Sequence, residues 1–250
     1  MSSDLVSLHL LMVTASGPQR ELWREGAAMA SIPIDFDAGD AAAAKIVLAK
    51  GGVDICVLDQ ALSDDDKAAV IKAARRSKNP APIVFVSAPR GSVRPDNIDG
   101  ALPKAANADD ARKLVETCIR VKMPTKVLIA GDSGTTRGVV HKVLAASRFD
   151  LDIHEASENS AALSQLRAGS FGMVFLDRGM LGLNGADPLA QIRREVPNVA
   201  IIIMTSDRDD ADAARSKLRG TLALLKKPFY PADVDAVLER YYGLHQSDAS

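Results

Sequence analysis

Short, almost wholly apolar runs recur along the second half of the chain, and segments with apolar residues every three or four positions separate them. Runs this short and apolar are typical of strands buried on both faces of a parallel sheet. Between them, Val139, Val140, Val143 and Leu144 would share one face of a helix. Strands that alternate with helices in this way predict a doubly wound α/β domain with a five-stranded parallel sheet. The expected strands cover residues 126–130, 152–156, 173–176, 200–204 and 222–225.

The chain contains an internal repeat. Each half holds an apolar run that ends in Leu-Asp, at Asp59 in the first half and at Asp177 in the second. The shift that carries Asp59 onto Asp177 also carries Ser87 onto Thr205, and both lie at the ends of apolar runs. Matches in the same order along both halves predict two copies of one domain. We expect these copies over residues 1–122 and 126–244, followed by a tail over residues 245–250.

The two copies differ in one crossover. The segment from Ser87 to Lys104 is shorter than the segment from Thr205 to Lys227, and its stretch APRGSVRPDNIDG carries two prolines and two glycines. Proline and glycine interrupt helices. The fourth helix of the first copy is therefore predicted to be shortened or missing.

Composition narrows the class of protein. The chain has 47% hydrophobic and 25% charged residues, which excludes a disordered chain. Its formal net charge of −1 argues against a chain-wide basic surface for nucleic acid. The two cysteines form no disulfide framework, and we see neither a secretory signal nor a membrane-spanning run. These features predict a cytoplasmic protein that binds neither nucleic acid nor membrane.

Some local patterns are expected to be structural only. Ser63, followed by three aspartates at 64–66, predicts a capped helix start with acidic residues in its first turn. Ser133 predicts a second N-cap. Cys56 lies in an apolar run and is expected in the core.

Polar residues follow the expected strands of the second copy. Asp132 comes after the first strand, Asp177 after the third, Thr205 after the fourth and Lys227 after the fifth. The carboxyl ends of parallel strands meet at one edge, so these side chains are expected to converge. Two carboxylates favour an oxygen-ligated cation such as Mg²⁺, while a hydroxyl and an ammonium bind phosphoryl oxygens. Such a set can form an aspartyl phosphate.

The segment FLDRGMLGLNG, which contains Asp177, is similar to the phosphoacceptor segment of receiver domains in bacterial two-component response regulators. Met180 and Gly185 stand at that family's spacings. IIIMTSD resembles the strand that ends in the family's switch hydroxyl, here Thr205. LLKKPFYP resembles the Lys-Pro-Phe signature with Lys227, and a cis bond is expected before its proline. The chain thus resembles two flavodoxin-like receiver domains in tandem.

This resemblance implies a role for each site residue. Asp177 would be the phosphoacceptor, and Thr205 and Lys227 would bind the phosphoryl group. Asp132, Asp177 and the backbone carbonyl of Gly179 would hold Mg²⁺. Such a domain promotes its own phosphorylation and dephosphorylation and is not a conventional enzyme.

The second copy departs from the family pattern at three positions. Gly131 replaces the first member of an acidic pair, so Mg²⁺ binding is expected to be weak. Leu224 replaces an aromatic switch residue, so a signal would have to pass through Thr205. Leu181 replaces a proline.

The first copy departs further. It keeps Asp59, Ser87 and Lys104, but Thr14-Ala15 replaces the acidic pair. Without a carboxylate from its first strand, a hard cation has too few charged ligands there. Asp59 could then form only a structural ion pair with Lys104. We interpret this copy as a degenerate receiver, or pseudo-receiver.

These features predict a response regulator without a separate output domain. A histidine kinase or a histidine phosphotransfer protein would phosphorylate it, and a downstream protein would read the result. The first copy would serve as an adaptor or a homodimer surface. The alternative is a scaffold in which neither copy is phosphorylated. An aspartate-based phosphohydrolase is disfavoured, because Gly179 stands where its second acid is expected.

Overall fold

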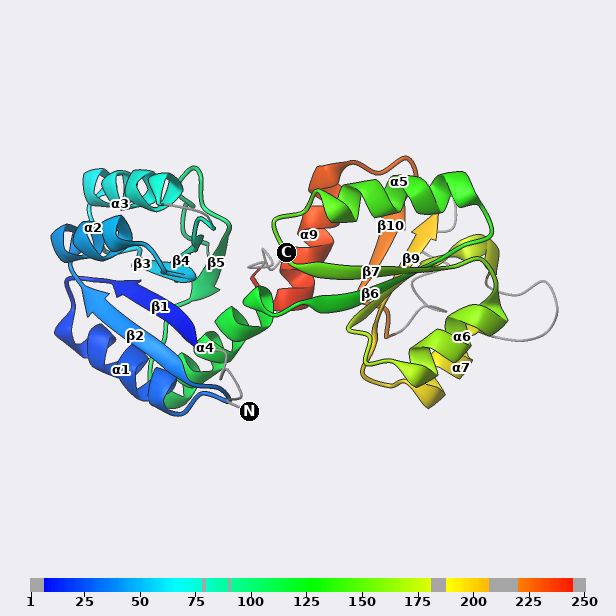
Figure 1. Ribbon diagram of the computed structural model, residues 1–250, viewed down its shortest axis with the longest axis horizontal. Helices are drawn as coiled ribbons and strands as arrows, with labels where there is room; N and C mark the ends of the chain where they lie inside the picture. The colour runs from blue at the N-terminus through cyan, green and yellow to red at the C-terminus, as the bar shows by residue number, and fades with distance from the viewer. Residues whose placement is uncertain (1–6, 78–79, 90, 181–187, 207–219, 245–250) are drawn as a thin grey trace. The chain divides into compact units, whose positions relative to one another are not determined.

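The structure is a computed structural model of the 250-residue chain, and it describes residues 7–77, 80–89, 91–180, 188–206 and 220–244. The chain divides into two compact units. The first contains Met1–Lys122 and Tyr242–Ser250, and the second contains Met123–Tyr241. Each unit is built on a five-stranded sheet with helices on both faces (Figure 1).

The sheet of the first unit has the strand order β2-β1-β3-β4-β5, and all neighbouring strands run parallel. Its inner strands are almost completely buried, because helices cover both faces of the sheet. The strands are β1 (Leu8–Val13), β2 (Ile34–Gly39), β3 (Ile55–Asp59), β4 (Ile83–Ala88) and β5 (Gly100–Pro103).

The helices of the first unit pack in pairs. Helix α1 packs against α4, and α2 packs against α3. The first pair approaches closely at Gly26, where an added Cβ would lie 2.7 Å from the backbone of Ala111 and Arg112. Trp23 fills the same face of α1 and is fully buried. The helices are α1 (Gly17–Ala28), α2 (Ala41–Lys50), α3 (Asp64–Arg76) and α4 (Ala108–Lys122).

The crossover from β4 to β5 contains no helix in its described residues, 89 and 91–99. The predicted loss of the fourth helix is therefore confirmed for the described part of this crossover. Pro89 and Pro95 remove backbone donors, and Gly91 and Asn97 adopt positive φ angles of 77° and 61°. A chain with these constraints turns repeatedly and does not propagate a helix.

The second unit repeats the architecture. Its sheet has the order β10-β9-β8-β6-β7, which is the same arrangement as in the first unit. Each predicted strand is present within one residue at either end, so the doubly wound fold is confirmed. The expected fourth helix and tail lie outside the described residues. The elements are β6 (Thr125–Ala130), α5 (Gly134–Ala145), β7 (Leu151–Ala156), α6 (Asn159–Ala168), β8 (Met173–Asp177), a 3-10 turn (Arg178–Met180), α7 (Pro188–Glu195), β9 (Ala200–Thr205), β10 (Ala223–Lys226) and α9 (Pro231–Tyr242).

Both predicted serine caps are present. Ser63 Oγ accepts a hydrogen bond from the Asp66 N–H (3.1 Å), and Ser133 Oγ accepts one from the Thr136 N–H (3.2 Å). Each serine thus satisfies a backbone donor that a helix start leaves unpaired. None of the helices in the described part of the chain is long and apolar enough to cross a bilayer.

Both cysteine thiols are expected to be inert in the native chain. Burial raises the pKa of Cys56 and of Cys118 to about 12, and for Cys56 the nearby Arg75 cation offsets this only in part. Well below that pKa the thiol stays protonated, and only the thiolate is a good nucleophile. At pH 8 we expect no reaction with Ellman's reagent in the native chain and two reactive thiols in guanidinium. Rapid labelling without denaturant would contradict this.

Candidate functional site

The strand order brings four of the predicted residues to one edge of the second sheet. Strand β8 lies between β6 and β9, and β10 lies beyond β9. Asp177 ends β8 and Thr205 ends β9, while Asp132 follows β6 and Lys227 follows β10. The register pairs Asp177 with Met204, one residue before Thr205. The topology therefore gathers side chains that lie far apart in sequence.

Asp177 is the centre of this group. It is only 7% exposed, and Lys227 Nζ donates to its Oδ2 at 2.5 Å. The Gly179 N–H donates to Oδ1 at 3.2 Å. A carboxylate that is nearly buried needs such partners, because burial of an unpaired charge is costly. The Asp177 side chain is thus held in place by one cation and one backbone donor.

Asp132 lies beside the same point. A Cβ added at Gly179 would lie 3.7 Å from Asp177 Oδ1 and 4.0 Å from Asp132 Oδ2. The two carboxylates thus flank one backbone position. The described residues contain no group of three acidic, histidine or cysteine side chains suited to a metal ion. Two carboxylates and a carbonyl nevertheless suit Mg²⁺, which keeps several of its waters in proteins.

Gly131 packs closely against Asp177. A Cβ at this position would lie 3.3 Å from Asp177 Cβ and 3.6 Å from its Oδ2. The Gly131 carbonyl accepts a hydrogen bond from Arg137 Nη1 (2.7 Å), and Arg137 Nε donates to Glu155 Oε2 (3.1 Å). His141 Nδ1 lies 2.9 Å from Glu155 Oε1. Sequence reasoning missed this network, because its members carry no motif and meet only through the fold.

The substitution Gly131→Asp is expected to tighten Mg²⁺ binding by about tenfold, because it adds a third carboxylate beside Asp177. Gly131→Asn is the matched control, since it adds similar volume without charge. Binding can be measured by calorimetry or by Mn²⁺ competition. The tryptophan fluorescence does not report on this unit, because the single tryptophan is Trp23. Equal affinities of the two variants would contradict the prediction.

Thr205 and Leu224 lie on the neighbouring strands β9 and β10. The Lys227 N–H donates to the Thr205 carbonyl (2.7 Å), which ties the ends of β9 and β10 together. Leu224 is partly buried against the core of this unit. The bond between Lys227 and Pro228 is cis, as predicted. Leu181 and Gly185 lie outside the described residues.

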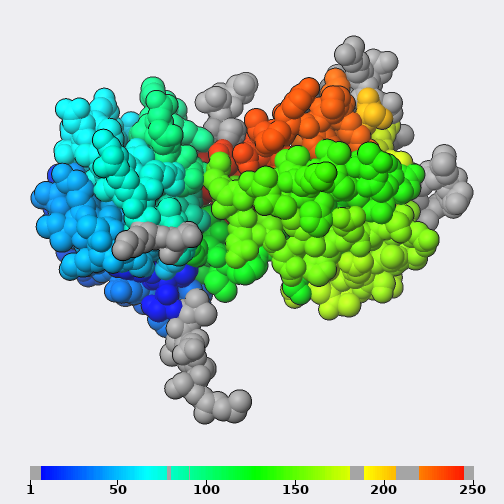
Figure 2. Space-filling model, turned by 45° about the horizontal axis from the view of Figure 1, so that its top comes forward, coloured from blue at the N-terminus to red at the C-terminus, as the bar shows by residue number. Residues whose placement is uncertain are grey.

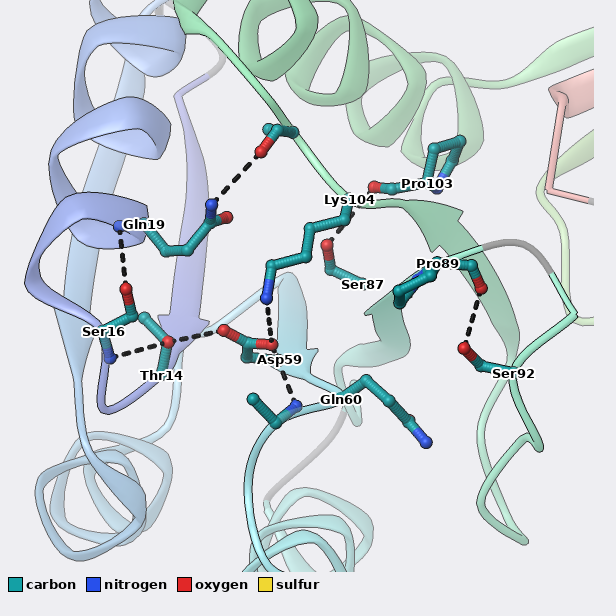
Figure 3. Close-up of polar contacts among 12 residues, drawn as sticks. Thr14, Ser16, Gln19, Asp59, Gln60, Ser87, Pro89, Ser92, Pro103 and Lys104 are labelled. Carbon is teal, nitrogen blue, oxygen red and sulfur yellow. Dashed lines mark hydrogen bonds and ion pairs between the residues drawn. The ribbon is translucent and has the colours of Figure 1, made fainter.

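The corresponding site of the first unit is closed by hydrogen bonds (Figure 3). Asp59 is 1% exposed, and its Oδ2 accepts a hydrogen bond from Thr14 Oγ1 (2.8 Å). Its Oδ1 accepts from Lys104 Nζ (3.3 Å) and from the Ala61 N–H (3.0 Å). Ser87 Oγ donates to the Pro103 carbonyl (3.3 Å), away from Asp59. Asp59 and Lys104 thus form the structural ion pair considered above.

Thr14 has a role that sequence reasoning did not find. It stands at a position where receiver domains usually have an acidic residue. Its hydroxyl donates a hydrogen bond to one carboxylate oxygen of Asp59. The same hydroxyl accepts a hydrogen bond (3.1 Å) from the N–H of Ser16, the residue that caps the start of α1. A neutral donor thus replaces a negative metal ligand, and a cation loses a place to bind.

Comparison with known proteins agrees with this geometry. A family model described as the response regulator receiver domain matches residues 127–239. Chemotaxis protein CheY-3 of Vibrio cholerae is 28% identical over 119 residues, which cover 47% of this chain and 91% of that protein. The chain carries two receiver-like domains in tandem. Receiver domains act in two-component signalling, typically bind Mg²⁺ and usually serve as phosphoacceptors.

Other known proteins match the chain in part or along most of its length. A protein-glutamate methylesterase/protein-glutamine glutaminase of Anaeromyxobacter dehalogenans is 31% identical over 111 residues, which cover 44% of this chain and 32% of that protein. A solved structure of a probable two-component system response regulator/GGDEF domain protein covers 94% of this chain and 98% of its own, with a TM-score of 0.55 and 18% identity. The full-length likeness extends the shared fold to both units.

Proposed function

We propose that Asp177 accepts a phosphoryl group from the phosphohistidine of a histidine kinase or a histidine phosphotransfer protein, and that the chain then signals through protein contacts. The observation that supports this most directly is the pairing of a nearly buried Asp177 with Lys227, beside a second carboxylate. In the transfer, an Asp177 oxygen forms a bond to phosphorus as the phosphorus–nitrogen bond breaks, and the imidazole takes up a proton.

Each neighbouring residue contributes to this step. Lys227 orients Asp177, and its ammonium would bind a phosphoryl oxygen as negative charge gathers there. Thr205 would donate its hydroxyl to another phosphoryl oxygen. Asp132, Asp177 and the Gly179 carbonyl would hold Mg²⁺, which when bound neutralises charge on the phosphoryl oxygens. Because Leu224 replaces the aromatic switch residue, Thr205 and its loop would carry the signal.

The test uses acetyl phosphate, a small acyl phosphate, with Mg²⁺ and the full chain. We expect intact mass spectrometry to show the gain of one phosphoryl group, which hydroxylamine removes. Asp177→Asn should abolish the gain, while the matched variant Asp59→Asn should retain it. No gain in the unmodified chain, or a gain that survives Asp177→Asn, would overturn the proposal.

For the first unit we propose an unphosphorylated role as an adaptor or a homodimer surface. The three donors on Asp59 favour this role, because they leave the acid no need for a metal ion. The scaffold alternative extends the same role to the whole chain. Saturable Mg²⁺ binding that Asp177→Asn weakens would count against that alternative.

A further inference from the structure

Helix α3 of the first unit faces a cleft. Residues of α3 form one side, residues 93–97 of the crossover from β4 to β5 form the other, and Gln60 lies between them. The cleft has a volume of about 860 Å³. In Figure 2 the crossover residues, in blue-green, stand beside the cyan surface of α3. The cleft adjoins the crossover whose described residues form no helix.

The α3 side of the cleft is a continuous helical stripe. Its residues recur every three or four positions, so they share one face of α3 over three turns. At about 1.5 Å per residue, this stripe is about 16 Å long. A second helix of three or four turns would match its length. The stripe consists of Asp64, Lys67, Ala68, Ile71, Lys72 and Arg75.

The opposite side is held in place by hydrogen bonds. Gln60 Nε2 donates to the Val93 carbonyl (3.2 Å), and Arg75 Nη2 donates to the Asn97 carbonyl (2.8 Å). Arg75 also pairs with Asp99 Oδ2 at 2.9 Å. The crossover is thus tied to the end of β3 and to α3. A preformed cleft binds a ligand with little loss of its own conformational entropy.

The cleft combines a small apolar surface with positively charged side chains around it. Val93 and Pro95 supply most of the apolar surface, because Val93 is 85% exposed whereas Ile71 is only 6% exposed. Lys72 and Arg76 form no ion pair with any residue that the structure describes. Two other cationic residues of the cleft are neutralised, since Lys67 pairs with Asp64 (2.9 Å) and Arg75 with Asp99, so Lys72 and Arg76 supply the charge open to a ligand.

We propose that this cleft binds an acidic, amphipathic helix of a partner protein. The apolar face of that helix would contact Val93 and Pro95, and its carboxylates would face Lys72 and Arg76. A helix that lies in an apolar groove is a common mode of peptide recognition, and complementary charge sets its specificity. The ligand would lie beside α3, where the described residues of the crossover form no helix. The cleft lies wholly in the first unit, so this proposal does not rest on phosphorylation at Asp177.

The test uses the full chain and a fluorescein-labelled synthetic peptide of about 15 residues, or four turns. The peptide carries leucines on one helical face and glutamates elsewhere. We expect saturable binding by fluorescence anisotropy, weakened by salt because the attraction is electrostatic. The double variant Lys72→Glu/Arg76→Glu should weaken binding by about tenfold or more. Lys45→Glu/Lys50→Glu makes the same charge change at exposed residues of α2 outside the cleft, and should stay within about twofold of the unmodified chain.

A second variant separates binding from folding. Val93→Asp changes an exposed residue, so it should leave the circular dichroism spectrum unchanged and still weaken binding. Three outcomes would overturn the proposal: no saturable binding, equal binding of a peptide with the same residues in shuffled order, or tighter binding of a DNA duplex with the same dependence on Lys72 and Arg76. The last would assign the cleft to nucleic acid.

Discussion

Replacing Lys227 with methionine is expected to slow the phosphorylation of Asp177 by about 10²–10³-fold, the usual effect of removing one preorganised group that stabilises transition-state charge. Lys227 Nζ lies 2.5 Å from Asp177 Oδ2. Its ammonium can therefore stabilise negative charge first on the carboxylate and then on the phosphoryl oxygens. Methionine keeps much of the side-chain volume without the charge. The rate is measured as phosphoryl mass gained over time with acetyl phosphate and Mg²⁺.

The adjacent lysine supplies the control. Lys226 is exposed at the end of β10, so Lys226→Met should phosphorylate at the rate of the unmodified chain. Circular dichroism should show both variants folded. If Lys227→Met is folded and reacts at the normal rate, Lys227 is only a structural partner of Asp177.

Trp23→Ala is expected to destabilise the first unit by about 3–5 kcal/mol. Trp23 is fully buried on the face of α1 that carries Gly26. The α1 backbone already touches the α4 backbone at Gly26, so the two helices cannot move closer to fill the cavity. When the surrounding structure cannot collapse into the cavity, the loss of stability lies at the upper end of this range. Urea unfolding followed by far-ultraviolet circular dichroism measures the effect, because the variant has no tryptophan.

The conservative variant tests the reason for this loss. Trp23 Nε1 is buried without a hydrogen-bond partner among the described residues. Trp23→Phe removes that unpaired donor and keeps one ring, so it should cost much less than Trp23→Ala. The unfolding transition of the second unit should not move in either variant. Equal losses for both variants would contradict the cavity explanation.

Sequence reasoning predicted the fold and where the site residues lie in it. Buried strands leave a plain apolar signal, and Pro89, Pro95 and Gly91 marked the lost helix for clear steric reasons. The convergence on Asp177 followed from topology, because parallel strands end at one edge. These features depend on residue type and order alone.

The hydrogen bonds within each site could not be predicted in the same way. The Ser87 hydroxyl points to the Pro103 carbonyl, and Thr14 points to Asp59, through side-chain rotation that spacing does not encode. The Arg137–Glu155 contact joins two elements of ordinary composition. The cleft beside α3 depends on how the crossover turns, which the prolines and glycines permit without specifying.

The shared strand order of the two sheets has a consequence for refolding. Every strand pair in the described residues is parallel, so each must close across a long stretch of chain, which makes folding slow. During that time, an apolar strand of one half can pair wrongly with strands of the other half, because the two halves have equivalent strands. We expect dilution from denaturant at high protein concentration to yield misassembled and aggregated chains. Synthesis on the ribosome avoids this competition, because the first sheet can form before the strands of the second exist.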